Sequence, residues 1–111
     1  NAHGTSTPKG DAAEVECLRT VFGSALEKIP VSSNKSQIGH TLGASAAIEA
    51  ALSIEGMQRG VILPTVNHIP DPKLTDVDVV PNHVRKQHYE FFLSNAFGFG
   101  GTNCCIIFKG V

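Results

Sequence analysis

Apolar residues recur at helical spacing in two stretches of the chain. In the first, the spacing predicts a helix that runs to about Phe22, with Asp11 as its N-cap and Glu14 completing a capping-box-like pattern. A second helix is predicted from Thr41 to about Gly60. The second stretch is rich in glycine, alanine and serine, which are small enough to let a helix lie close against other backbones. We therefore expect the second helix to be buried.

Shorter extended patterns separate and follow these helices. Short strands are predicted around residues 29–33, 61–66 and 76–80, with a proline-rich connection before the last of them. Residues 89–95 and 104–109 are rich in β-formers and flank a glycine-rich turn, which predicts an antiparallel hairpin. The order of helix, strand, helix, strand, connection and hairpin predicts an α/β layered fold.

Composition narrows the class of protein. The chain has 111 residues, of which 41% are hydrophobic and 17% are charged, with a formal net charge of −1, which is typical of a soluble globular domain. This balance does not favour nucleic acid or an anionic membrane as a partner, and no run of about 20 apolar residues is present. Three cysteines, two of them adjacent, make a poor disulfide framework and favour a reducing compartment. The cysteines and histidines lack the paired spacing of a zinc site, so we expect no metal.

Three segments rich in glycine and in hydroxyl or amide side chains carry the most chemistry. They are residues 1–8 (NAHGTSTP), 34–43 (NKSQIGHTLG) and 94–103 (SNAFGFGGTN), and the first two each contain a histidine. Three such segments in one short chain predict a single active site assembled from separated loops. The other histidines lie in polar, loop-like sequence, which is typical of solvated surface; they are His68, His83 and His88.

His40 lies at the predicted start of the second helix. Unpaired amides and the helix dipole disfavour an added positive charge there, and a neutral imidazole can donate a hydrogen bond to a developing oxyanion. The alternative is that His40 only caps the helix, but Gly39 and Gly43 would admit a ligand. Glu49 falls in the same predicted buried helix, where its carboxylate needs a cationic partner, and Lys35 is the nearest candidate. The alternative is that Glu49 faces water.

The glycine-rich turn at residues 98–101 differs from a phosphate-binding loop. It lacks the Lys-Ser/Thr pair of a P-loop, and a predicted strand rather than a helix follows it. Its glycines fit unusual backbone conformations that would present the amide of Phe99 and move its ring. A plain tight hairpin turn is the alternative.

The motifs HGTSTP, NKSQIGHTLGA and SNAFGFGGTN together resemble the β-ketoacyl-acyl carrier protein synthases, the condensing enzymes of the thiolase fold. The resemblance covers nearly the whole chain, with the motifs in the family's order. Ser6 resembles the fatty-acid type, because modular polyketide synthase domains typically read HGTGT. A histidine at position 40 resembles the elongating rather than the initiating type. The fold implied is the C-terminal part of a layered α-β-α-β-α architecture.

The resemblance implies a decarboxylative condensation. A cysteine accepts an acyl chain from acyl carrier protein, malonyl carrier protein loses carbon dioxide, and the enolate that forms attacks the thioester. His3 and His40 match the family's two active-site histidines, which stabilise the carbonyl oxygen as it becomes an enolate.

The remaining site residues are carried over from the same motifs. Lys35 matches the lysine that organises the family's site, and Glu49 matches its carboxylate partner. Thr5 and Thr7 match hydroxyl donors to the pantetheine arm. Phe99 matches a gating phenylalanine whose amide joins the oxyanion hole of the acyl-cysteine.

The family's nucleophilic cysteine lies in its N-terminal half and has no counterpart here. Cys17 is expected to be a structural thiol, and Cys104 and Cys105 fall in the closing strand, so none is expected to be catalytic. The chain opens inside a motif. We therefore expect residues 1–111 to be the C-terminal part of a synthase, lacking the first strand of that half and the whole N-terminal half. Such a fragment is expected to be inactive, and parts of its apolar faces are expected to be left uncovered.

Partners and location follow from the resemblance alone. It implies acyl carrier protein as partner, loaded with acyl or malonyl groups, and a homodimer in the complete enzyme. No cofactor of the protein's own is implied, because the phosphopantetheine arrives on the carrier protein, and the expected location is cytoplasmic or an organellar matrix or stroma. Alternatives are a polyketide-type ketosynthase, a silent chain-length-factor-like partner or a noncatalytic binding module. Silent partners tend to lose site residues, and this chain keeps His3, Lys35 and His40.

Overall fold

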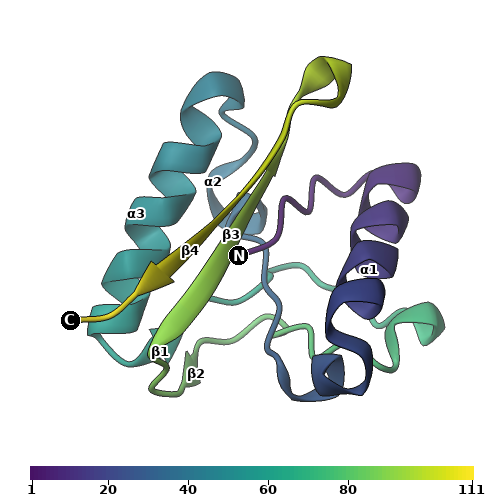
Figure 1. Ribbon diagram of the computed structural model, residues 1–111. Coiled ribbons are helices and arrows are strands. Elements are labelled where there is room, and N and C mark those ends of the chain that lie inside the picture. The colour runs from purple at the N-terminus through teal and green to yellow at the C-terminus, as the bar shows by residue number, and fades with distance from the viewer.

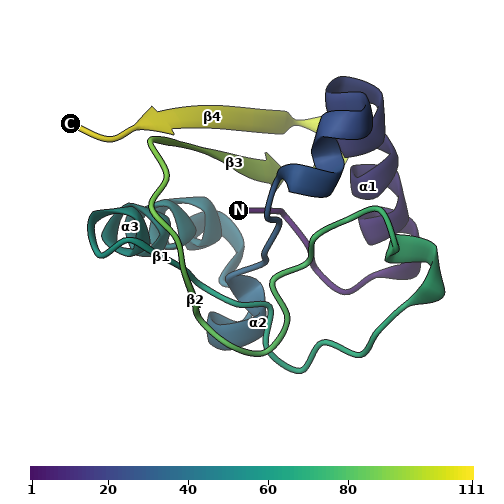
Figure 2. The same ribbon diagram turned by 90° about the horizontal axis from the view of Figure 1, so that it is seen from below.

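The computed structural model describes all of residues 1–111 and shows a layered α/β arrangement (Figure 1). A long hairpin, made of β3 (Phe91–Phe97) and β4 (Asn103–Lys109), crosses the molecule between helices α3 (Ser45–Gln58) and α1 (Pro8–Phe22). Viewed from below, α3 lies beneath the hairpin, and the N-terminal segment runs from the hairpin toward α1 (Figure 2). None of the helices is long and apolar enough to cross a membrane.

Helix α1 begins one turn earlier than the apolar spacing predicts. The Thr7 hydroxyl accepts a hydrogen bond from the Gly10 amide at 3.2 Å and caps the helix, and Pro8 fits its first turn. The prediction of Asp11 as N-cap is therefore wrong. Glu14 does not close a capping box either, because its carboxylate binds amides of the N-terminal segment instead. A 3-10 turn, η1 (Gly23–Lys28), follows α1.

The second predicted helix is shorter and less buried than expected. A single turn, α2 (Lys35–Ile38), and a 3-10 turn, η2 (Leu42–Ala44), precede α3, which begins at Ser45 rather than Thr41. Only one face of α3 is buried, and small residues on its other face are exposed, namely Ala46, Ala47 and Ala51. The expectation of burial is wrong for this face, because no element of the chain covers it.

The strands confirm the hairpin and correct the rest. β3 and β4 pair antiparallel from Phe91↔Lys109 to Phe97↔Asn103, as the sequence predicts. The predicted strand at 61–66 shrinks to β1 (Val61–Ile62), which pairs antiparallel with β2 (Arg85–Lys86), a strand without an apolar pattern that could have revealed it. The strands predicted at 29–33 and 76–80 reduce to one parallel bridge between Val31 and Val79, and a third 3-10 turn, η3 (Pro72–Leu74), precedes the second of these segments.

The buried interior holds more polar than apolar side chains. Its apolar members are Ala2, Leu26, Val77 and Val80. Eight buried residues are polar or charged, namely Glu14, Ser32, Ser33, Asn34, Lys35, Ser45, Glu49 and Ser94. Buried polar groups are costly unless they are hydrogen-bonded, so this concentration marks a candidate functional site.

Candidate active site

The Glu49 carboxylate lies at the centre of the buried polar cluster. The Lys35 ammonium contacts both of its oxygens, at 2.7 and 2.8 Å, with the two side chains only 5% and 1% exposed. The Ser45 hydroxyl donates to the same carboxylate at 2.5 Å and the Asn1 amide at 3.0 Å. Burial raises the pKa of Glu49, but these hydrogen bonds outweigh it and hold that pKa below its ordinary value. Glu49 is therefore a charged, paired group, and it does not face water.

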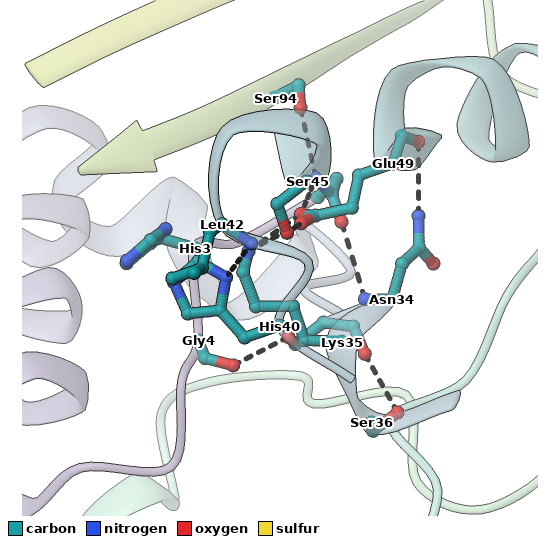
Figure 3. Close-up of polar contacts among 12 residues, drawn as sticks. His3, Gly4, Asn34, Lys35, Ser36, His40, Leu42, Ser45, Glu49 and Ser94 are labelled. Carbon is teal, nitrogen blue, oxygen red and sulfur yellow. Dashed lines mark hydrogen bonds and ion pairs between the residues drawn. The ribbon is translucent and has the colours of Figure 1, made fainter. Parts of the chain in front are cut away.

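Hydrogen bonds connect the Lys35–Glu49 pair to the two motifs that contain His3 and His40 (Figure 3). The Asn1 amide bridges Glu49 and the Ser94 hydroxyl of β3, each at 3.0 Å. The Asn34 amide, just before α2, donates to the Glu49 carbonyl at 3.3 Å and to the Ser53 hydroxyl at 3.0 Å. One buried cluster thus joins the start of the chain, α2, α3 and β3.

The first motif is also held directly against Ser32 and Ser33, which immediately precede the second motif. The Ala2 amide donates to the Ser32 carbonyl at 2.8 Å, and the Ser33 hydroxyl donates to the Gly4 carbonyl at 2.7 Å. Gly4 has a φ of +31°, and a β-carbon at this position would lie 2.8 Å from that of Ser33, so only glycine allows this approach.

This contact places His3 beside His40. Their ring centroids are 5.6 Å apart and their planes are nearly perpendicular, at 89°. Figure 3 shows the two rings adjacent, to one side of the Lys35–Glu49 pair. The prediction that separated loops assemble one site is thus matched by the geometry of these two histidines.

The proton state of His3 is set by its partial burial. Desolvation and then the nearby charge of Lys35 lower the pKa of His3 from its ordinary value of 6.5. The Nδ1 atom of His3 is buried without a hydrogen-bond partner. The Phe97 ring lies against the His3 ring, with 5.2 Å between the ring centroids. The ring is therefore neutral near pH 7. Phe97 is a contact that sequence reasoning missed, because Phe97 and Phe99 each precede a glycine in the same motif and nothing local distinguishes them.

The imidazole of His40 is exposed and oriented by the backbone. Its Nδ1 atom accepts a hydrogen bond from the Leu42 amide at 3.2 Å, which leaves the proton of the neutral ring on Nε2. Leu42 adopts a positive φ of 54°, which is strained for leucine. The expectation that His40 begins a long helix is wrong, because α3 starts only at Ser45. The backbone amide of Leu42, a residue with a strained φ, orients the ring instead.

Glu14 is a site residue that sequence reasoning assigned elsewhere. It is 4% exposed, and its carboxylate accepts hydrogen bonds from the amides of His3 and Gly4, both at 2.9 Å. The Asn95 side chain donates to the same carboxylate at 3.1 Å. Helix α1 thus holds the main chain of the first motif from the side opposite Glu49. An acidic residue near a helix start resembles a cap, and no local pattern distinguishes the two roles.

The remaining predicted residues lie outside the buried cluster. The hydroxyls of Thr5 and Thr7 lie 3.4 Å apart. Phe99 lies in the 3-10 turn η4 (Phe99–Gly101) at the tip of the hairpin and is 95% exposed, so no contact within this chain brings it to the histidines. All three cysteines are exposed, which does not fit the structural role expected for Cys17. No group of three or more histidine, cysteine, aspartate or glutamate side chains is placed to hold a metal ion.

Comparison with known proteins places this geometry in a family. Residues 1–68 match the family described as "Beta-ketoacyl synthase, C-terminal domain". The chain is 44% identical over 110 residues to 3-oxoacyl-[acyl-carrier-protein] synthase 2 of Staphylococcus aureus, covering 98% of this chain and 27% of that protein. The chain therefore spans about a quarter of the length of this relative.

Solved structures agree in fold. A β-ketoacyl synthase from Burkholderia phymatum STM815 superposes with a TM-score of 0.91 at 45% identity, covering 100% of this chain and 27% of that one. A type II polyketide ketosynthase, bound to a hexaketide and in complex with its acyl-carrier protein, gives a TM-score of 0.94 at 33% identity with the same coverage. The expected thiolase-like α/β fold is thereby confirmed for this portion. The chain belongs to the β-ketoacyl synthase family and aligns with its C-terminal domain.

Proposed function

We propose that this chain is the C-terminal portion of a 3-oxoacyl-[acyl carrier protein] synthase that elongates fatty acids. The observation that carries the proposal is the pair of imidazoles, His3 and His40, held 5.6 Å apart beside a buried Lys35–Glu49 ion pair. The identity to a curated synthase of this type over 98% of the chain supports the same activity.

The imidazole pair suits the decarboxylation step. When the bond between the malonyl carboxylate and its neighbouring carbon breaks, carbon dioxide leaves and the electron pair moves onto the thioester carbonyl oxygen. His40 offers an Nε2–H donor to that oxygen, since its Nδ1 accepts from Leu42. His3 is neutral because its pKa is lowered, and the N–H group of its neutral ring is a second donor. Two preoriented donors stabilise the enolate as its charge develops.

The enolate carbon then attacks the carbonyl of an acyl-cysteine, and the cysteine sulfur leaves as a thiolate. That cysteine belongs to the part of the proposed enzyme outside this chain, so we expect residues 1–111 alone to be inactive. We assign Thr5 and Thr7 to the pantetheine arm, because their hydroxyls are adjacent on the exposed edge of the site. Phe99, exposed at the hairpin tip, is assigned to the gate over the acyl-cysteine.

The partner proposed is acyl carrier protein, on which the phosphopantetheine arrives. The similar polyketide ketosynthase whose structure includes its acyl-carrier protein supports this choice. A homodimer in the cytoplasm is proposed from the family resemblance.

The test is a pair of assays on the complete protein: carbon dioxide release from malonyl carrier protein, and acyl loading of the cysteine. Removing one oxyanion donor costs about 10²- to 10³-fold in rate, so His40→Ala should lower decarboxylation by roughly that factor while loading persists. His83→Ala is the matched control, because His83 is exposed and its side chain makes no hydrogen bond. Retained decarboxylation in His40→Ala, or another residue in place of the nucleophilic cysteine, would remove the proposal.

A further inference from the structure

The carboxylate of Glu14 is buried without a cation. No lysine, arginine or histidine forms an ion pair with this carboxylate, yet Glu14 is only 4% exposed. A buried charge of this kind depends on hydrogen-bond donors, and it has three. Two are the backbone amides of His3 and Gly4, and the third is the side-chain amide of Asn95.

Asn95 is the only side-chain donor among the three, and it comes from a different layer of the fold. It lies in β3, whereas Glu14 lies in α1, on the other side of the N-terminal segment (Figure 1). The Asn95 backbone amide also donates to the Asn1 carbonyl at 3.0 Å. Asn95 therefore holds the first motif twice, directly through its backbone and indirectly through Glu14.

The geometry of β3 links this contact to the imidazole. Residues two apart on a strand share a face, so Asn95 and Phe97 point to the same side. Phe97 places its ring against His3 at 5.2 Å. One face of β3 thus fixes both the main chain and the ring of His3. Its other face presents Ser94 to the Asn1 amide and the Glu49 cluster.

We propose that Asn95 is a positioning residue for His3. Its amide completes the donor set of Glu14, and Glu14 in turn holds the His3 and Gly4 amides. Because Asn95 lies in the strand that leads to the turn carrying Phe99, this link also couples the hairpin to the imidazole pair. The inference rests on the proposed condensing function. It assigns to Asn95 a role that acts through another residue, without contact to the substrate.

Asn95→Ala in the complete protein is the first experiment. Misplacing a reacting group by about 1 Å can cost up to 10²-fold, so we expect decarboxylation of malonyl carrier protein to fall roughly 10- to 100-fold. Acyl loading should change by less than about twofold, since it does not require His3 as an oxyanion donor. Asn95→Gln retains an amide donor and should recover part of the rate. Gln58→Ala removes an exposed amide without hydrogen bonds at the end of α3 and should change neither assay.

The decisive measurement repeats Asn95→Ala in a His3→Ala background. If Asn95 acts through His3, the second substitution should lower decarboxylation no further. Equal losses in both backgrounds, or a parallel fall in loading, would overturn the inference in favour of a general structural role. If Asn95→Ala does not fold, Asn95→Ser, whose hydroxyl is too short to reach Glu14, takes its place with the same expectations. A parent protein that performs no decarboxylation would refute the proposed function and this inference together, whereas an active parent with an unaffected Asn95→Ala refutes only the inference.

Discussion

The base and the rim of the site differ sharply in exposure and bonding. The base consists of the half-buried Asn1 and the buried Asn34, Lys35 and Ser45, which hydrogen-bond around Glu49. The rim consists of exposed residues, namely Ser6, Thr7, His40 and Phe99. The base spans three segments of the chain, namely its start, α2 with the residue before it, and α3. The side-chain hydrogen bonds of the rim residues, in contrast, are local or absent. His3 lies between the two regions, half-buried and bonded through its backbone.

The base and the rim therefore have different roles: the base positions the loops, and the rim is available to a substrate. A network whose members satisfy one another fixes the relative positions of the loops, because moving any member leaves a buried polar group unpaired. The rim contributes little to that network, and its side chains are therefore free to meet a substrate. Substitutions that break the hydrogen bonds of the base should lower the free energy of unfolding, whereas truncating a rim side chain without hydrogen bonds, such as that of Phe99, should not.

The largest expected effect comes from removing the cation of the base. Lys35→Met keeps an unbranched apolar stem but leaves Glu49 buried and unpaired, so the complete protein should lose about 3–5 kcal/mol of unfolding free energy. Arg59→Met removes the cation of an exposed pair with Glu55 and should have no measurable effect in the same denaturant titration. Adding Glu49→Gln to Lys35→Met should restore part of the loss. If Lys35→Met proves as stable as the parent, the base has no anchoring role.

His3, between base and rim, should make stability depend on pH. Its pKa is lower in the folded protein than the ordinary 6.5, because burial and Lys35 disfavour the charged ring. The unfolded chain therefore binds more protons in the window between the two values, and stability is lost as the pH falls from about 6.5 through the folded pKa. Denaturant titrations at several pH values should show this loss in the parent and a smaller one in His3→Gln. His83→Gln, an exposed control, should retain the full dependence, and an unchanged slope in His3→Gln would contradict the assignment.

The parts predicted from sequence are those encoded by local patterns. Two runs of β-forming residues around a glycine-rich turn predicted the hairpin, and the turn sets the register of the two strands. The pairing of Lys35 with Glu49 followed from the cost of an isolated buried carboxylate. Both arguments need only neighbouring sequence and one physical rule.

The parts that escaped prediction depend on tertiary contacts. Glu14 looks like a helix cap, but the amides it binds lie 10 and 11 residues earlier in the chain. β2, at Arg85–Lys86, exists only because β1 lies beside it. The exposed face of α3 shows the same limit, since composition indicates that a helix can pack closely but not whether another element covers it.

At the rim, Phe99→Ala should separate function from stability. The side chain is 95% exposed, so its removal should change the unfolding free energy by no more than about 0.5 kcal/mol. If the ring gates the acyl-cysteine, the same variant should shift the loading rates of short and long acyl chains relative to one another. An unchanged substrate profile would remove the gate assignment, and a large loss of stability would show that the hairpin tip is packed in the complete protein.

The smallest effect on function is expected from Ser6→Gly, also at the rim. Ser6 has a positive φ of 62°, a conformation that costs a residue with a β-carbon roughly 1–2 kcal/mol. Glycine relieves this strain, but it gives back about 0.4–1 kcal/mol through the greater freedom of the unfolded chain. The net gain in unfolding free energy should therefore lie between about 0 and 1.6 kcal/mol. Decarboxylation should be unchanged, because the Ser6 side chain makes no hydrogen bond. Ser6→Val, with a branched β-carbon, should instead lower stability. A loss of stability in Ser6→Gly would mean that the hydroxyl makes a contact in the complete protein, and the rim would then be more tightly bonded than this chain shows.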